Sequence, residues 1–281
     1  MADIILSAFA DECAESTEEQ LRAMRHHGID YVEVRHLDGK NVSILSEGEL
    51  RDARRLFDLF GVGVSAIGSP LGKIRLDEDL AAHLETAKRV FAAAEILGTP
   101  LVRVFSFYAP RGENIHALRD DVLDALSRLL ALAHEHGVTL CHENEARIYG
   151  DTPSRCRELL DAFGGELRCV FDMGNFVLEG GTPYPEAYLL LRNYITYFHI
   201  KDALSAGAIV PPGKGEAGIA EILAEHRLYA EKDFFATLEP HLETFKGRNA
   251  LVGRSFENPY RYGSAKEAFS DAVTKFRGLT L

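Results

Sequence analysis

The sequence ValThrLeuCysHisGlu at residues 138–143 is a short apolar run that ends in a potential metal ligand. The second half of the chain repeats this arrangement at 167–172, 195–199 and 234–239, where the runs end in Asp172, His199 and Glu239. Runs of this length are typical of buried strands. In a (β/α) barrel, the residues at the C-terminal ends of parallel strands meet at one face. The pattern therefore predicts a barrel whose active site contains Glu143, Asp172, His199 and Glu239.

Apolar runs alternate with helical patterns along the whole chain. The predicted strands are 4–9, 30–35, 62–67, 101–105, 138–142, 167–171, 195–199 and 234–238. The predicted helices are 17–27, 46–60, 77–97, 114–136, 152–163, 185–193, 218–226 and 264–276. Capping boxes, a first-turn proline and glycines after the last turn define most of these helices. We expect residues 1–281 to form a single α/β domain, a (β/α)8 TIM barrel.

The loops of the predicted barrel are asymmetric. Single glycines follow several helices, whereas longer polar stretches follow the strands, for example at 200–217 and 239–263. Long loops after the strands are typical of a barrel whose active site is at that face. A doubly wound open sheet is the alternative, but it usually has a glycine-rich turn after its first strand, and SerAlaPheAlaAspGlu at 7–12 is not one.

Composition restricts the class of protein. The chain is 46% hydrophobic and has a formal net charge of −12, which opposes binding to a phosphate backbone and makes nucleic acid an unlikely partner. No apolar run approaches the roughly 18 residues of a membrane span. The first residues resemble no signal peptide, and Cys13, Cys141, Cys156 and Cys169 have no CxxC spacing. We expect a cytoplasmic protein with reduced cysteines and no membrane contact.

The negative charge of the three predicted carboxylates requires a cation to balance it. Taken singly, an acidic residue after a strand is usually a helix cap or a solvated loop residue, and His199 could be a hydrogen-bonded buried histidine. Taken together, three carboxylates in a cavity of low dielectric constant could not all remain ionised without a cation. The mixed oxygen and nitrogen set without a thiolate suits Mn²⁺, Mg²⁺ or Co²⁺.

Four motifs in the sequence resemble those of a known family. They are GluAsnGlu at 143–145, PheAspMetGlyAsnPhe at 171–176, PheHisIleLysAspAla at 198–203 and LeuGluProHisLeu at 238–242. They are similar to the motifs of the sugar phosphate isomerase/epimerase family, part of the xylose isomerase-like TIM barrel superfamily. That superfamily also includes ketose 3-epimerases, hydroxypyruvate isomerase, inosose dehydratase and endonuclease IV. The similarity extends over essentially the whole chain.

The resemblance implies that Glu143, Asp172, His199 and Glu239 bind one divalent metal, Mn²⁺ first and otherwise Mg²⁺, Co²⁺ or Zn²⁺. It further implies that Glu143 and Glu239 are catalytic and transfer protons on opposite faces of a sugar or sugar phosphate. Proton removal next to a carbonyl gives a cis-enediolate. Return of the proton to the opposite face is epimerisation, and return at the neighbouring carbon is aldose–ketose isomerisation. A homodimer or homotetramer is also expected from the resemblance.

The sequence departs from the ketose 3-epimerases at two positions, where Asn175 replaces a histidine and Ser205 replaces an arginine. Three alternatives to the isomerase therefore remain open. They are an inosose dehydratase-like lyase, an endonuclease IV-like DNA-repair enzyme and a sugar-binding barrel without catalysis.

Six further residues are candidates for substrate binding: Glu33, Lys73, Arg103, Glu145, Asn175 and Lys201. Glu33 could hold a sugar hydroxyl or form an ion pair with Arg35 or Arg103. Lys73 follows a glycine-rich turn, but the spacing is one residue too short for a phosphate-binding P-loop and no Ser or Thr follows the lysine. Lys73 is instead a candidate for contact with a substrate phosphate, and Arg103 is expected to be paired or to face the substrate.

Overall fold

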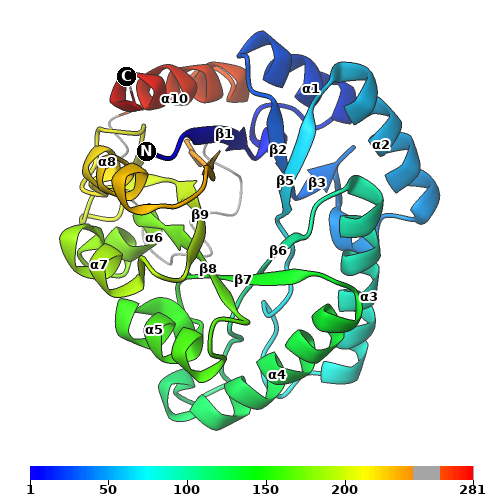
Figure 1. The fold of residues 1–281 in the computed structure, drawn as a ribbon, viewed down its shortest axis with the longest axis vertical. Helices are drawn as coiled ribbons and strands as arrows, with labels where there is room; N and C mark the ends of the chain where they lie inside the picture. The colour runs from blue at the N-terminus through cyan, green and yellow to red at the C-terminus, as the bar shows by residue number, and fades with distance from the viewer. Residues whose placement is uncertain (243–259, 281) are drawn as a thin grey trace.

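Eight parallel strands close into a barrel in the computed structural model, which describes residues 1–242 and 260–280. Around the ring the strand order is β1, β12, β9, β8, β7, β6, β5 and β2, and the ring closes between β2 and β1 (Figure 1). The strands are β1 (Ile4–Ala8), β2 (Tyr31–Val34), β5 (Gly63–Ile67), β6 (Leu101–Val104), β7 (Thr139–Glu143), β8 (Arg168–Asp172), β9 (Ile195–Ile200) and β12 (Phe234–Leu238). The predicted (β/α)8 barrel is confirmed, and each predicted strand boundary is within one residue of the observed one.

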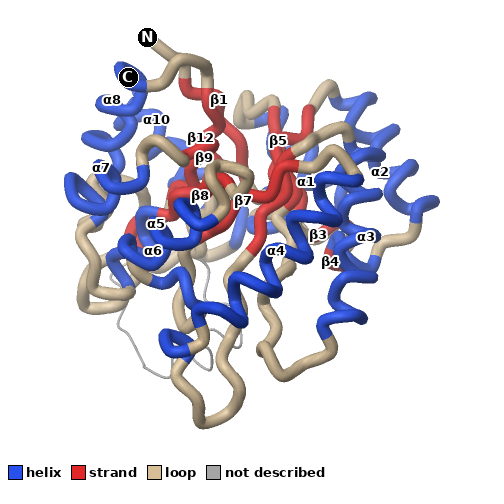
Figure 2. The backbone as a smooth tube through the Cα atoms, turned by 60° about the horizontal axis from the view of Figure 1, so that its bottom comes forward, coloured by secondary structure: helices blue, strands red, loops and turns tan. Residues whose placement is uncertain are grey.

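The helices form an outer layer around the barrel, as Figure 2 shows in blue around the red strands. They are α1 (Thr17–His26), α2 (Glu47–Phe60), α3 (Leu80–Leu97), α4 (Arg119–Glu135), α5 (Pro153–Ala162), α6 (Met173–Leu178), α7 (Tyr188–Leu191), α8 (Ile219–Tyr229) and α10 (Ala265–Thr280). Short 3-10 helices cover Ala10–Glu12, Val42–Ile44, Ile115–Ala117 and Tyr149–Asp151, and a π-helix covers Pro183–Ala187. Among the described residues, no helix is long and apolar enough to span a bilayer.

Local capping explains most helix boundaries. Ser46 and Glu49 form the predicted capping box at the start of α2, and Gly61 ends this helix with φ 63°. Thr152 caps α5, and Pro153 occupies its first turn as predicted. Two helices in the C-terminal part of the chain end later than predicted. α8 extends to Tyr229 and α10 to Thr280.

Two predicted helix starts and one predicted loop were wrong. Asp79, not Asp77, caps α3 by accepting a hydrogen bond from the Ala82 amide, so this helix begins at Leu80. The helix expected from residue 114 begins at 119 instead, after the separate 3-10 turn at 115–117. The stretch 173–183 was predicted to be a loop, yet α6 begins directly after β8.

The cause of α6 is the Asp172 side chain, which accepts a hydrogen bond of 2.8 Å from the Asn175 amide and caps the helix. The region predicted as a helix at 185–193 is divided between the π-helix Pro183–Ala187 and α7. The predicted loop 239–263 lies mostly outside the described residues.

Two small antiparallel pairs lie beyond the C-terminal ends of the barrel strands. β3 (His36–Leu37) pairs with β4 (Lys40–Asn41), and β10 (Asp202–Ala203) pairs with β11 (Ile209–Val210). The buried Asp202 carboxylate accepts hydrogen bonds from the backbone amides of Gly213, Gly215 and Ala217. Together with the β10–β11 pair, these bonds order the long loop after β9.

The interior of the barrel contains a separate apolar layer, formed by Ala66, Cys141, Val170 and Tyr197. Side chains two residues apart on a strand point to the same face. Cys141, Val170 and Tyr197 each precede a predicted metal ligand by two residues, so this layer is the floor beneath those ligands. The four cysteines are free and buried, as expected for small apolar side chains.

Candidate active site

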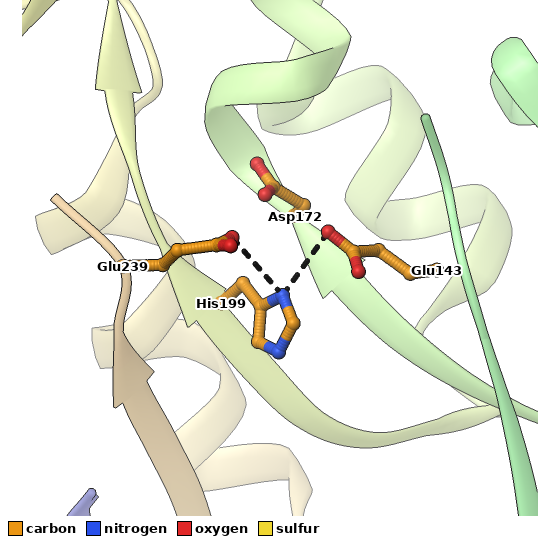
Figure 3. A group of neighbouring side chains, drawn as sticks. All are labelled: Glu143, Asp172, His199 and Glu239. Atoms are coloured by element: carbon orange, nitrogen blue, oxygen red, sulfur yellow. Dashed lines mark ion pairs between the residues drawn. The ribbon is translucent and has the colours of Figure 1, made fainter. Parts of the chain in front are cut away.

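The four predicted metal ligands converge at the C-terminal ends of neighbouring strands. Glu143 ends β7, Asp172 ends β8, His199 lies near the end of β9, and Glu239 follows β12. One ligand atom from each residue lies within 4.8 Å of those of the other three, and all four side chains are buried. Figure 3 shows the side chains pointing toward one another. We call these four residues the ligand cluster.

His199 lies between the two glutamates of the ligand cluster. Its Nδ1 is 3.1 Å from Oε1 of Glu143 and 3.4 Å from Oε2 of Glu239 (Figure 3). Burial by itself lowers the pKa of His199, but the charges of Glu33 and Glu143 outweigh burial and raise the pKa well above its usual value. Without a metal, His199 therefore holds a proton that a divalent cation would have to displace.

Besides His199, the side chain of Lys201 places a positive charge next to the carboxylates of the ligand cluster. Its Nζ lies 2.7 Å from Oδ2 of Asp172 and 3.0 Å from Oε2 of Glu239, and it donates a hydrogen bond of 3.2 Å to Asn175. Burial and the neighbouring Glu143 and Glu239 raise the pKa of Asp172 to about 7, despite the opposing charge of Lys201. Lys201 and Asn175 both contact Asp172, while their predicted contact with a substrate stays a prediction.

Two arginines flank the carboxylates of the ligand cluster. Arg103 Nη1 lies 3.1 Å from Oε2 of Glu143, and Arg35 Nη1 lies 3.0 Å from Oε1 of Glu239. Burial would raise the pKa of Glu143, but the charges of His199 and Arg103 hold this pKa at about 2. Burial likewise opposes ionisation of Glu239, but Lys201 and other cations hold its pKa well below the usual range. Both glutamates are therefore ionised at neutral pH.

The donor set fits a divalent cation. Three carboxylates and one imidazole provide hard and borderline ligands, and the described residues add no thiolate to the cluster. Within the described part of the chain, Oε2 of Glu143, Nδ1 of His199 and Oε2 of Glu239 are buried and make no hydrogen bond of good geometry. Such atoms are costly when unsatisfied, and a bound metal would satisfy all three.

Glu33 does not form either of the ion pairs expected for it. It lies on β2 with no exposed surface, and it contacts His199 Nε2 and the Tyr197 hydroxyl instead of Arg35 or Arg103. Arg35 pairs with Asp11, Glu12 and Glu239. Arg35 was not among the predicted site residues, because its contact with Glu239 joins positions far apart in the chain.

Lys73 and Glu145 contact each other above the ligand cluster. Lys73 Nζ lies 3.1 Å from Oε2 of Glu145 and 4.1 Å from the centre of the Phe105 ring. Both side chains are partly exposed, unlike the ligands. They come from the loops that follow β5 and β7, so they flank the segment that follows β6 and would be accessible to a substrate.

A second group of possible ligands, Glu12, Glu239 and His241, shares Glu239 with the first. Arg35 lies among these carboxylates, with Nη2 3.4 Å from Glu12 and Nη1 3.0 Å from Glu239. The guanidinium therefore already provides positive charge at this position. His142, the other histidine beside a ligand, hydrogen-bonds Ser106 at 2.9 Å and faces away from the ligand cluster.

The sequence profile of the xylose isomerase-like TIM barrel family matches residues 21–246. No curated protein matches the chain in sequence. One similar solved structure is the probable 3-DHS dehydratase AsbF from Bacillus anthracis, with a TM-score of 0.73, 18% identity, and coverage of 100% of this chain and 99% of that one.

Two further solved structures have similar folds. A xylose isomerase-like TIM barrel protein from Mycobacterium smegmatis in complex with magnesium has a TM-score of 0.71 and 18% identity, covering 98% of this chain and 96% of that one. The 3-keto-D-glucoside 4-epimerase YcjR from E. coli has a TM-score of 0.67 and 16% identity, covering 90% and 97%. At these identities the structures establish the fold alone. The profile match over most of the chain establishes more: the protein belongs to the xylose isomerase-like TIM barrel family.

Proposed function

We propose that this protein is a divalent-metal-dependent isomerase that transfers a proton on a sugar or sugar phosphate, either as an epimerase or as an aldose–ketose isomerase. The observation that carries the proposal is the placement of Glu143 and Glu239 on opposite sides of His199, each beside its own arginine. Two carboxylates that face a common centre suit proton removal at one face of a substrate by the ionised group, and proton delivery at the other face by its partner once that partner has taken up a proton from solvent.

The ligand cluster would hold the metal, with Mn²⁺ as the first choice and Mg²⁺, Co²⁺ or Zn²⁺ as alternatives. When bound, such a cation would polarise neighbouring carbonyl and hydroxyl oxygens of the substrate and so acidify the C–H between them. Glu143 or Glu239 then removes that proton, which leaves a cis-enediolate. In an epimerase the opposite glutamate, after taking up a proton from solvent, delivers that proton to the other face. In an isomerase the glutamate that removed the proton returns it to the neighbouring carbon.

Other residues near the cluster have supporting roles in this proposal. His199 and Arg103 keep Glu143 ionised, and Lys201 does the same for Glu239, so either glutamate can accept a proton. The Lys201 ammonium and the Asn175 backbone amide donate to Asp172 and orient it. Lys73 and Glu145 are placed to contact the far end of a substrate, including a phosphate on Lys73. The free, buried cysteines suit a cytoplasmic location, and the expected dimer or tetramer stays a prediction.

A dehydration is the second candidate, because it begins with the same proton removal. If a hydroxyl lies on the carbon next to the carbanion, its loss competes with return of the proton. Lys201, an ammonium in contact with Asp172 and Glu239, is close enough to the cluster to protonate a departing hydroxyl. The similar fold of a probable dehydratase is consistent with this alternative.

Hydrogen–deuterium exchange followed by NMR tests both candidates. The protein would be loaded with Mg²⁺ or Mn²⁺, freed of excess metal, and incubated in D₂O with tetroses, pentoses, hexoses and their phosphates. We expect deuterium next to the carbonyl of one substrate class and loss of that exchange in Glu143→Gln and Glu239→Gln. Glu18→Gln, a substitution at the surface, is the matched control and should exchange like wild type.

The outcomes separate the alternatives. A protein that binds one metal but exchanges no deuterium into the whole panel would contradict the isomerase proposal. Formation of a conjugated enone from an inosose, seen by its ultraviolet absorbance, would then indicate the lyase. Cleavage of abasic DNA would indicate an endonuclease, and ligand binding without any turnover would indicate a sugar-binding barrel.

A further inference from the structure

Glu33 is a carboxylate within the floor of the barrel. It lies on β2, while its partners Tyr197 and His199 lie on β9, and β1 and β12 separate these strands in the ring. Its side chain therefore crosses the barrel interior. Oε1 accepts a hydrogen bond of 3.1 Å from the Tyr197 hydroxyl, and Oε2 lies 3.0 Å from Nε2 of His199.

Burying a charged carboxylate at this position costs free energy, because the group loses its contact with water. Glu33 has no exposed surface, and the apolar floor layer lies around Tyr197. Within residues 1–242 and 260–280, the one ion pair of Glu33 is with His199. An apolar side chain of similar volume would fill the same space, and replacing buried ionic groups in this way is often neutral or stabilising. Packing alone therefore does not explain a glutamate here, and its effect on His199 has to be considered.

The two nitrogens of His199 face different partners. Nε2 faces Glu33, whereas Nδ1 faces Glu143 and Glu239 in the ligand cluster. A neutral imidazole has one N–H and one lone pair to distribute between its nitrogens. A carboxylate at Nε2 holds the N–H there, which leaves the lone pair of Nδ1 directed at the metal position. Hydrogen bonds of this kind orient metal-bound histidines and raise their basicity.

Tyr197 completes this arrangement. Its hydroxyl donates to one oxygen of Glu33 while His199 faces the other, and the Glu33 side chain has no exposed surface. The substrate-binding role predicted for Glu33 stays a prediction, and its observed contacts are with Tyr197 and His199. We propose that Glu33, held by Tyr197, is a positioning residue that keeps His199 in the Nε2–H tautomer and directs Nδ1 toward the metal. This inference rests on the metal site of the proposed function.

The tautomer itself provides the first test. Zinc is diamagnetic, so long-range ¹H–¹⁵N spectra of zinc-loaded wild-type protein report which imidazole nitrogen carries the proton. His199 is assigned by the signals that disappear in His199→Asn. We expect the Nε2–H pattern for His199. Zinc bound through Nε2, with the proton on Nδ1, would overturn the inference without any variant of Glu33.

Metal affinity provides the second test, by calorimetric titration with Zn²⁺. Glu33→Leu removes the acceptor, and we expect its affinity to fall about 10- to 100-fold, with a mixed tautomer of His199. Glu33→Gln removes only the charge and should lie between Glu33→Leu and wild type. Tyr197→Phe keeps the Glu33–His199 contact and should lose less than Glu33→Leu. Cys141→Ala changes the same floor layer without a hydrogen bond to His199, and it should bind zinc like wild type.

The controls separate a structural effect from a positioning effect. A purely structural role of Glu33 would change the thermal stability of the metal-free protein and leave zinc affinity and the tautomer unchanged. Wild-type zinc affinity and an unchanged tautomer in Glu33→Leu would overturn the inference. If Glu33→Leu does not fold, unchanged affinity in Glu33→Gln overturns it equally. Failure of wild type itself to bind any metal would contradict the proposed function instead.

Discussion

Arg35 and Glu239 form a buried ion pair, with Nη1 of Arg35 3.0 Å from Oε1 of Glu239, although 204 residues separate them in the chain. The same guanidinium pairs with Asp11 and Glu12 and lies 4.4 Å from the centre of the Phe9 ring. It thereby joins residues that follow β1, β2 and β12. A predicted catalytic glutamate thus depends on a cation from the opposite end of the sequence.

Replacement of Arg35 by methionine should therefore impair both turnover and folding. Loss of the guanidinium leaves three carboxylates without their shared cation, and breaking a buried pair in this way typically costs about 3–5 kcal/mol. We expect kcat/KM to fall at least about tenfold, because Glu239 loses the ion pair that holds its Oε1 in position. Arg35→Lys should recover part of the loss, since it restores the charge without the planar fork. Kinetics and urea unfolding measure the two effects, and wild-type values for Arg35→Met would contradict the prediction.

Lys201→Met should destabilise the metal-free protein far more than the metal-bound protein. The ammonium of Lys201 contacts Asp172 and Glu239, so its removal leaves two buried carboxylates close together, at a cost of about 3–5 kcal/mol. A divalent cation in the ligand cluster would replace the missing charge. Urea unfolding with EDTA and with Mn²⁺ measures the difference. Lys73→Met breaks a partly exposed pair with Glu145 and should change stability by less than about 1 kcal/mol in both conditions.

Gly72→Ala should destabilise the fold, and Gly112→Ala is its matched control. Both glycines have φ 84°, which disfavours any residue with a Cβ. A Cβ at Gly72 would also overlap the carbonyl oxygen of Phe105, whereas one at Gly112 would meet nothing within 4 Å. We expect Gly112→Ala to cost about 1 kcal/mol and Gly72→Ala more than about 3 kcal/mol. Urea unfolding measures both costs. Equal midpoints for the two variants would contradict the prediction, because they would mean that the backbone shifts to remove the overlap with Phe105.

His226 should make the protein less stable in mild acid. Burial lowers the pKa of His226 to about 4, and its Nδ1 lies 3.2 Å from the Tyr188 hydroxyl. An unfolded chain with a histidine pKa of about 6.5 binds the proton more readily, so stability falls as the pH drops below that value and levels off below the folded pKa. We expect about 2 kcal/mol to be lost between pH 7 and pH 5 through this group. His226→Phe should lack this part of the loss in urea unfolding, and identical pH profiles would contradict the assignment.

The sequence was sufficient for the fold because its signals are local. Each apolar run alternates with a capped helix, and the ligand of each of the last four units lies at or just after the end of its strand. Once the strands are parallel and neighbouring, Glu143 and Asp172 must lie at the same end of the barrel. The α6 helix was missed because Asp172, expected only as a ligand, also accepts the bond that starts the helix.

The sequence by itself determined the barrel and the members of the ligand cluster, since residue type, strand period and helix caps are properties of short segments. Only the tertiary structure decided the surroundings of that cluster. The pairing of Arg35 with Glu239 and the contact of Glu33 with His199, which spans 166 residues, exist because the barrel closes β2 onto β1. Closure brings buried charges together without regard to their distance in the chain, so their partners follow from the folded geometry alone.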